Sequence, residues 1–155
     1  MDVKYVLAVD PGKTTGVSFM SLDDSPTLLS SGEYQPDEFA QPIRDTFAWC
    51  AANGIEFEIV CERFIINAQT VRNSQAPFSL EQIGALKQIM RDHDVDPDTK
   101  LVFQSPSDAK KMFPNDALRK VGTWHVGGGG HANDSIRHGL LRLVKLGWKP
   151  IVLLQ

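Results

Sequence analysis

An apolar run that ends on a single acid, close to the start of the chain, constrains the fold more than any other feature. Tyr5 to Val9 has the composition of a buried strand, Asp10 follows it directly, and Pro11 and Gly12 then favour a tight turn. A strand over 4–10 would hold one carboxylate at the edge of a sheet. The alternative is that Asp10 only forms the turn, since Asp is common at such positions.

The rest of the chain alternates strand and helix signals. Period-two and short apolar runs predict further strands at 17–22, 27–34, 56–62 and 100–104. Apolar residues spaced by three or four positions, together with start and stop signals, predict helices at 40–53, 79–93, 106–112, 115–121 and 131–146. Ser79 and Gln82 have the form of a capping box at the start of the second of these helices. This order predicts one α/β or α+β domain over residues 1–155.

Three further residues with ligand chemistry follow from this arrangement. If the strand 56–62 lies parallel beside the strand 4–10, Glu62 and Asp10 end side by side. His131, Asp134 and His138 lie at i, i+3 and i+7 on one face of the last helix, which can direct them at the strand ends. Taken singly, Glu62 is also explained as a solvated or ion-paired acid, and His131 and Asp134 as ordinary residues of a helix N-terminus.

Carboxylates within a few ångströms of each other disfavour each other's charge, and a divalent cation removes that penalty. Carboxylate oxygens are hard ligands suited to Mg²⁺ or Mn²⁺, and two such ions about 3.5–4 Å apart can hold the attacking and leaving oxygens of a phosphodiester. Asp10, Glu62, His131 and Asp134 therefore form the predicted catalytic and metal-binding set. We interpret His138 as a supporting or structural residue.

Composition excludes several other classes of protein. The 155 residues fit one domain, the net charge of −3 argues against indiscriminate nucleic-acid binding, and no run of 18 apolar residues predicts a membrane span. No leader pattern is present, so we expect a cytoplasmic protein. Cys50 and Cys61 lie in apolar patterns and are expected to be reduced. A P-loop before Lys13 would need glycine where Leu7 stands.

Three segments together resemble the RuvC-type Holliday junction resolvases of the ribonuclease H-like superfamily. They are Val6 to Gly12 followed by Gly16, Glu62 after the fourth strand, and His131 to Ser135. The resemblance implies a ribonuclease H-like, five-stranded mixed sheet flanked by helices, with strands 1–3 antiparallel and strands 4 and 5 parallel to strand 1. It also implies that the four ligands hold two ions, with His131 at a helix position that members fill with aspartate or histidine.

The same resemblance implies the activity and the partners. The chain would be a hydrolase, a divalent-metal-dependent endonuclease that cuts four-way junctions, flaps and forks with an activated water, leaving a 5′-phosphate and a 3′-hydroxyl. It would act as a homodimer, for which we predict the helix 79–93 with Gly84 as the contact surface. The compact size and the weak match around residues 63–78 favour a bacteriophage member active in the host cytoplasm.

Cations near the acidic centre are the predicted DNA contacts. They are Lys13, Lys110, Lys111, Arg119 and Lys120, although each pair on a helix could instead be a solvated face. Phe64 lies in the region where similar resolvases carry a junction-probing aromatic, and it is equally explained as a core residue. Four glycines, Gly127 to Gly130, are predicted to be mobile or closely approached, as a hinge that admits DNA.

Two other functions fit parts of the pattern. The turn from Asp10 to Gly16 also resembles the phosphate-binding hairpin of actin-like and sugar-kinase ATPases, but those proteins enclose a nucleotide between two such domains. A junction-binding module without cleavage would not need the ligand set. Since all four candidate ligands are present, we favour the enzyme.

Overall fold

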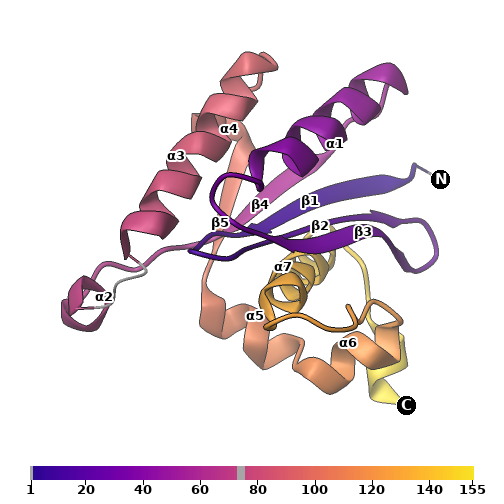
Figure 1. Ribbon diagram of the computed structural model, residues 1–155. Helices are drawn as coiled ribbons and strands as arrows, with labels where there is room; N and C mark the ends of the chain where they lie inside the picture. Colours follow the sequence, from indigo (N-terminus) through magenta and orange to yellow (C-terminus); the bar gives the residue numbers. More distant parts are fainter. Residues whose placement is uncertain (1, 73–75) are drawn as a thin grey trace.

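The computed structural model describes residues 2–72 and 76–155, which form a five-stranded sheet with helices on both faces (Figure 1). The strands, in chain order, are β1 (Lys4–Asp10), β2 (Thr15–Leu22), β3 (Pro26–Tyr34), β4 (Glu58–Glu62) and β5 (Leu101–Gln104). The helices are α1 (Ala40–Ala52), α2 (Ala68–Arg72), α3 (Ala76–Asp92), α4 (Pro97–Lys100), α5 (Pro106–Met112), α6 (Asn115–Val121), α7 (His131–Lys145) and the 3₁₀ turn η1 (Ile151–Leu154).

The strands lie in the order β3-β2-β1-β4-β5. β1, β2 and β3 form an antiparallel meander, and β4 and β5 run parallel to β1. This confirms the predicted mixed sheet and its strand directions. Parallel neighbours need a crossover. The chain passes through α1 before it enters β4 beside β1, and through α3 before it enters β5 beside β4.

Alternation along β1 divides the core into two layers. Leu7 and Val9 pack with α1 and α3 on one face, while Val6 and Ala8 pack with α5, α6 and α7 on the other. Figure 1 shows these two groups of helices on opposite sides of the sheet. Because both faces are covered, β1 is buried from Val6 onward, and full burial of each large aliphatic side chain stabilises the fold by about 1.5–3 kcal/mol. Asp10 continues the Val6 and Ala8 face, which is the α7 side.

Close contact between α7 and the sheet depends on two glycines. A Cβ on Gly16 would lie 1.9 Å from the backbone oxygen of His131, so only glycine lets the start of α7 approach β2. A Cβ on Gly139 would lie 2.4 Å from the end of the Met20 side chain. The glycine after the Asp10 turn therefore sets the distance between β2 and the first turn of α7.

Most predicted elements are confirmed with shifted ends, and one start signal is wrong. α3 begins at Ala76, so Ser79 and Gln82 lie inside the helix and do not cap it. The hydroxyl of Ser79 instead donates to the backbone oxygen of Pro11 at 3.2 Å, joining α3 to the turn after β1. β2 begins two residues earlier than predicted, and α2, α4 and η1 were not predicted at all.

Cys50 and Cys61 are free and buried, as expected for reduced thiols. Within residues 2–72 and 76–155, no helix combines the length and the apolar character that crossing a membrane requires.

Candidate metal centre

Asp10 and Glu62 lie side by side because β1 and β4 are parallel and in register. Val9 pairs with Cys61, so the next residue on each strand is a carboxylate. Ala8 and Val60 belong to the hydrophobic cluster under α7, and strand alternation directs Asp10 and Glu62 to the same side. Asp10 is only 8% exposed, which is incompatible with a solvated turn residue.

The two carboxyl groups share a hydrogen bond, which raises the pKa of Asp10 and lowers the pKa of Glu62. Burial, the hydrogen bond to Glu62 and the charge on Glu62 raise the pKa of Asp10 well above its ordinary value. Burial alone would raise the pKa of Glu62, but hydrogen bonds from His138 and Asp10 and the charge of Lys110 lower it to about 2. Asp10 is therefore the proton donor of this pair, and Glu62 the ionised partner.

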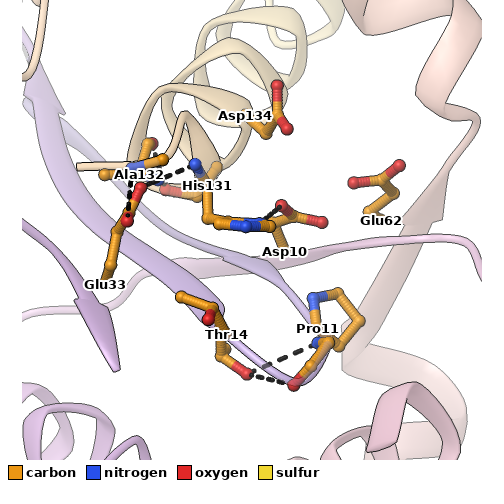
Figure 2. Close-up of polar contacts among 12 residues, drawn as sticks. Asp10, Pro11, Thr14, Glu33, Glu62, His131, Ala132 and Asp134 are labelled. Atoms are coloured by element: carbon orange, nitrogen blue, oxygen red, sulfur yellow. Dashed lines mark hydrogen bonds and ion pairs between the residues drawn. The ribbon is translucent and has the colours of Figure 1, made fainter. Parts of the chain in front are cut away.

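The first turn of α7 brings the other two predicted ligands to this pair. Nδ1 of His131 lies 3.6 Å from Oδ2 of Asp10. Ligand atoms of Asp10, His131 and Asp134 all lie within 4.8 Å of one another, and Glu62 adjoins them through Asp10. Figure 2 shows the four side chains turned toward a common space between the strand ends and α7. The structure thus assembles the whole predicted set from β1, β4 and α7.

Asp134 is held in place by an arginine of its own helix. Nε of Arg137 donates to Oδ1 of Asp134 at 3.0 Å. The other guanidinium nitrogens of Arg137 donate to the backbone oxygen of Phe113 and to Oδ1 of Asn115, at the junction of α5 and α6. Arg137 is nearly buried, so this bridge orients Asp134 and joins α7 to α5 and α6.

His138 performs the same role for Glu62. Its Nε2 lies 3.6 Å from Oε2 of Glu62, and its Nδ1 lies 3.1 Å from Nε2 of Gln104. The same Gln104 nitrogen donates to the backbone oxygen of His138 at 2.9 Å, which identifies it as the NH₂ group of the amide. Nδ1 of His138 is then an acceptor and Nε2 carries the proton toward Glu62. These contacts fit the interpretation of His138 as a supporting or structural residue, and that role stays a prediction.

A carboxylate on β3 binds the start of α7 from outside the helix. Both oxygens of Glu33 accept backbone hydrogen bonds, from Gly129 at 2.8 Å, His131 at 2.7 Å and Ala132 at 3.1 Å (Figure 2). Burial opposes the charge on Glu33, but these three hydrogen bonds and the charge on His131 outweigh it and lower the pKa of this carboxyl. Glu33 is therefore ionised and bound to the turn that carries His131.

Sequence reasoning missed Gln104, Arg137 and Glu33. Gln104 had the same signal as Asp10 and Glu62, because it is a polar residue at the end of an apolar strand and its neighbour across the sheet is Glu62. Arg137 had only its spacing from Asp134, three residues earlier on the same helix, and Glu33 had no local signal. The other partners of Arg137 lie 22 to 24 positions away and those of Glu33 lie 96 to 99 positions away, so only the packed fold reveals them.

Three of the five predicted DNA contacts line one of two hollows at the site, and the other two do not. Lys13 lines a hollow of about 310 Å³ over the four ligands. Lys110 and Arg119 line a second hollow of about 690 Å³, and Asp134 lines both hollows. Within the described part of the chain, Lys111 and Lys120 are exposed on the same helices but line neither of these hollows.

The structure argues against a core role for Phe64 and shows an unusual backbone in the glycine segment 127–130. Phe64 is half-buried and is a member of neither hydrophobic cluster of the described residues, so the core interpretation is not supported. Its contact with DNA stays a prediction.

Gly127, Gly128 and Gly130 have positive φ, and Gly128 is closely approached by the Glu33 carboxylate. The hinge itself stays a prediction.

The arrangement fits a divalent cation. It combines three carboxylates with one imidazole, two of the carboxylates are so close that they share a proton, and ligand atoms from two elements converge within 4.8 Å. An ion at this point would relieve the repulsion that otherwise forces Asp10 to hold a proton.

We expect Asp10→Asn to stabilise the metal-free protein, and the gain to grow with pH. Above its ordinary pKa of 3.8, folded Asp10 keeps a proton that the unfolded chain releases, so this group lowers stability as pH rises toward its folded pKa. The side-chain amide of asparagine would also donate to Glu62, but it does not titrate, so it avoids this loss of stability as pH rises. The thermal midpoints of wild type, Asp10→Asn and the exposed control Asp37→Asn, measured with EDTA at pH 5 and pH 8, test this. A gain equal at both pH values, or shared by the control, would contradict it.

The fold is similar to that of two solved Holliday junction resolvases. RuvC of Thermus thermophilus matches in two structures, one of them in complex with a Holliday junction substrate. The junction complex has a TM-score of 0.64 and 16% identity, covering 92% of this chain and 96% of that one. The Fowlpox virus resolvase, in a complex with Holliday junction DNA, matches with a TM-score of 0.55 and 11% identity, over 90% of this chain and 99% of that one.

No protein-family model matches the sequence, and no curated protein matches it. At these identities the structural likeness concerns the fold. The chain has the ribonuclease H-like fold in the form that RuvC and the poxvirus resolvase share, as its sequence motifs predicted.

Proposed function

We propose that this protein is a metal-dependent, structure-selective DNA endonuclease that cuts Holliday junctions and other branched DNA. The observation that carries the proposal is the convergence of Asp10, Glu62, His131 and Asp134 at the strand ends of this fold. A junction-binding module without cleavage would gain nothing from a buried pair of carboxylates that repel each other. The similar structures support the choice of substrate, since two of them hold junction DNA.

Asp10, Glu62, His131 and Asp134 would hold Mg²⁺ or Mn²⁺, most simply as two ions. Bound there, the ions would offset phosphate charge and favour the ionised form of the attacking water. Glu62 is already ionised and Asp134 is oriented by Arg137, so both are ready to act as ligands. Nδ1 of His131, beside Asp10, is the atom at which this residue binds or receives a proton.

The reaction is hydrolysis of a phosphodiester. The water oxygen bonds to phosphorus, the bond from phosphorus to the 3′-oxygen breaks, and that oxygen takes up a proton to leave as a 3′-hydroxyl. The product on the other side of the cut is a 5′-phosphate. Side chains of this chain position the phosphate and the water. In the alternative role, in which it does not hold an ion, the half-exposed His131 is placed to accept the proton that the water loses.

The strand would be gripped along the hollow beside Asp134. Lys110 is exposed at its edge and close enough to the carboxylates to lower the pKa of Glu62. The guanidinium of Arg119 lies over the ring of Trp124, 4.0 Å from its centre, and Asp116 binds it at 3.1 Å. Stacking on Trp124 fixes the orientation of the Arg119 guanidinium, which favours a contact with a phosphate.

We expect Asp10→Asn to abolish Mg²⁺-dependent cleavage and to leave binding of branched DNA intact, because only a ligand is lost. A panel of four-way junctions, flaps, forks and linear duplexes, cut with the wild type and with the exposed control Asp37→Asn, measures this. Cleavage by Asp10→Asn at the wild-type rate would refute the site.

The same proteins test the nucleotide-binding alternative. Equilibrium binding of ATP at physiological Mg²⁺ should be undetectable if the site acts on DNA. Tight ATP binding by a wild type that cuts none of the DNA panel would replace the nuclease with the actin-like function.

We expect Lys110→Ala to weaken binding of every branched DNA alike and to reduce the slope of log K against log salt by about 1, because one phosphate contact is lost. Lys145→Ala, which removes an equal charge at the far end of α7, should leave the slope unchanged. Binding titrations of Asp10→Asn carrying each substitution, at several salt concentrations without cleavage, provide the measurement. Equal slopes for the two variants would exclude Lys110 from the DNA path.

We infer that the protein acts as a homodimer through α3, since cutting a four-way junction symmetrically requires two active sites. Gly84 is exposed, and a Cβ there would meet nothing within 4 Å in the described part of the chain, so packing inside the molecule does not explain this glycine. Leu80, one turn earlier on the same face, is 49% exposed. A small residue beside an exposed leucine suits close approach of a second helix.

Gly84→Arg should therefore sediment as a monomer under conditions where the wild type and Ala48→Arg, an equal insertion on exposed α1, sediment as dimers. Thermal unfolding verifies that the variant is folded. A wild type that sediments as a monomer at all concentrations, or a dimer that survives Gly84→Arg, would contradict the surface.

A further inference from the structure

The start of α7 has no cap of its own. The first backbone N–H groups of any helix lack partners within the helix, and a polar side chain at the N-cap usually satisfies one of them. Here the N-cap is Gly130, with φ at +93°, which offers no side chain. The missing acceptor comes from β3, where the carboxylate of Glu33 receives hydrogen bonds from Gly129, His131 and Ala132.

The glycine segment makes room for this carboxylate. A Cβ on Gly128 would lie 2.7 Å from the carboxyl carbon of Glu33, closer than real side-chain carbons approach. Gly128 also has a φ of +76°, which any other residue would adopt with strain. Glycines ahead of His131 are therefore required at this point for Glu33 to reach the helix.

A second residue of β3 holds the far end of the same segment. The hydroxyl of Ser31 lies 2.6 Å from Nδ1 of His125, and Asn133 bonds both the N–H and the backbone oxygen of His125. Ser31 and Glu33 are two residues apart and point to the same face of the strand. The edge strand β3 thus binds the segment 125–132 at both of its ends.

We propose that Glu33 is a positioning residue of the metal centre: it fixes the first turn of α7 so that His131 and Asp134 face Asp10 before any ion or DNA is bound. The proposal deepens the proposed function and rests on it for the reaction. Glu33 contacts the backbone of His131 and acts through that residue (Figure 2). The Glu33 carboxylate also occupies the position in which the N-terminus of a helix can bind an anion. A DNA phosphate would therefore bind to other groups of the protein.

Glu33→Gln tests the proposal at nearly constant size. The glutamine side chain has only one oxygen to accept from the three backbone N–H groups that bind Glu33. Its NH₂ group, a donor itself, would face at least one of these N–H groups and could not accept from it. Hydrogen exchange of the Gly129, His131 and Ala132 amides should accelerate by about tenfold or more, because bonds to a charged acceptor are lost. Titration calorimetry with Mn²⁺ should show an affinity about tenfold lower. Glu38→Gln, an exposed glutamate five residues later, is the matched control and should change neither.

Cleavage kinetics separate positioning from DNA binding. Glu33→Gln should lower kcat and raise the Mn²⁺ concentration for half-maximal rate, with KM for the junction unchanged. Wild-type Mn²⁺ affinity in both Glu33→Gln and Glu33→Ala, with slow exchange at the three amides, would overturn the proposal. If the wild type cuts no branched DNA while Glu33→Gln still weakens Mn²⁺ binding, the nuclease function fails and the role of Glu33 stands. A wild type that binds no Mn²⁺ would overturn both.

Discussion

The parallel, in-register pairing of β1 with β4 is the constraint on which the rest of the structure depends. It brings Asp10 and Glu62 together at the α7 face of the sheet, where burial and mutual repulsion oppose their ionisation. The two hydrophobic layers stabilise the fold around a pair that, without a cation, destabilises it. Local conflict of this kind inside an otherwise consistent fold is typical of a functional site.

Around this pair, the functional side chains are held by partners that connect them to other elements of the fold. His138 supports Glu62 and is itself bound by Gln104 on β5, while Arg137 joins Asp134 to the junction of α5 and α6. Glu33 on β3 binds the turn that carries His131. Such fixed second contacts keep ligands close to a productive geometry in the absence of the ion. The site is thus a property of the entire sheet and of α7, and not of three short motifs.

Charge is distributed in a way that the overall value of −3 conceals. The acids of the site line a hollow together with Lys13, and Lys110 and Arg119 line a second hollow that shares Asp134 with the first. Cations beside a carboxylate centre favour the ionised ligands and attract a polyanion to the same place. The overall negative charge is therefore compatible with the proposed binding of DNA at this face.

The sequence by itself determined most of the elements, the strand that ends on Asp10, and the four candidate ligands, because apolar periodicity and the position of an acid at the end of an apolar run are local properties. It also contained, unrecognised, the signal of Gln104 at the end of β5. Tertiary structure alone decided that Ser79 binds the Asp10 turn, that Arg137 joins α7 to Phe113 and Asn115, and that Glu33 caps α7. These contacts join residues far apart in the chain, so their geometry exists only once β3, α3 and α7 are packed on the sheet.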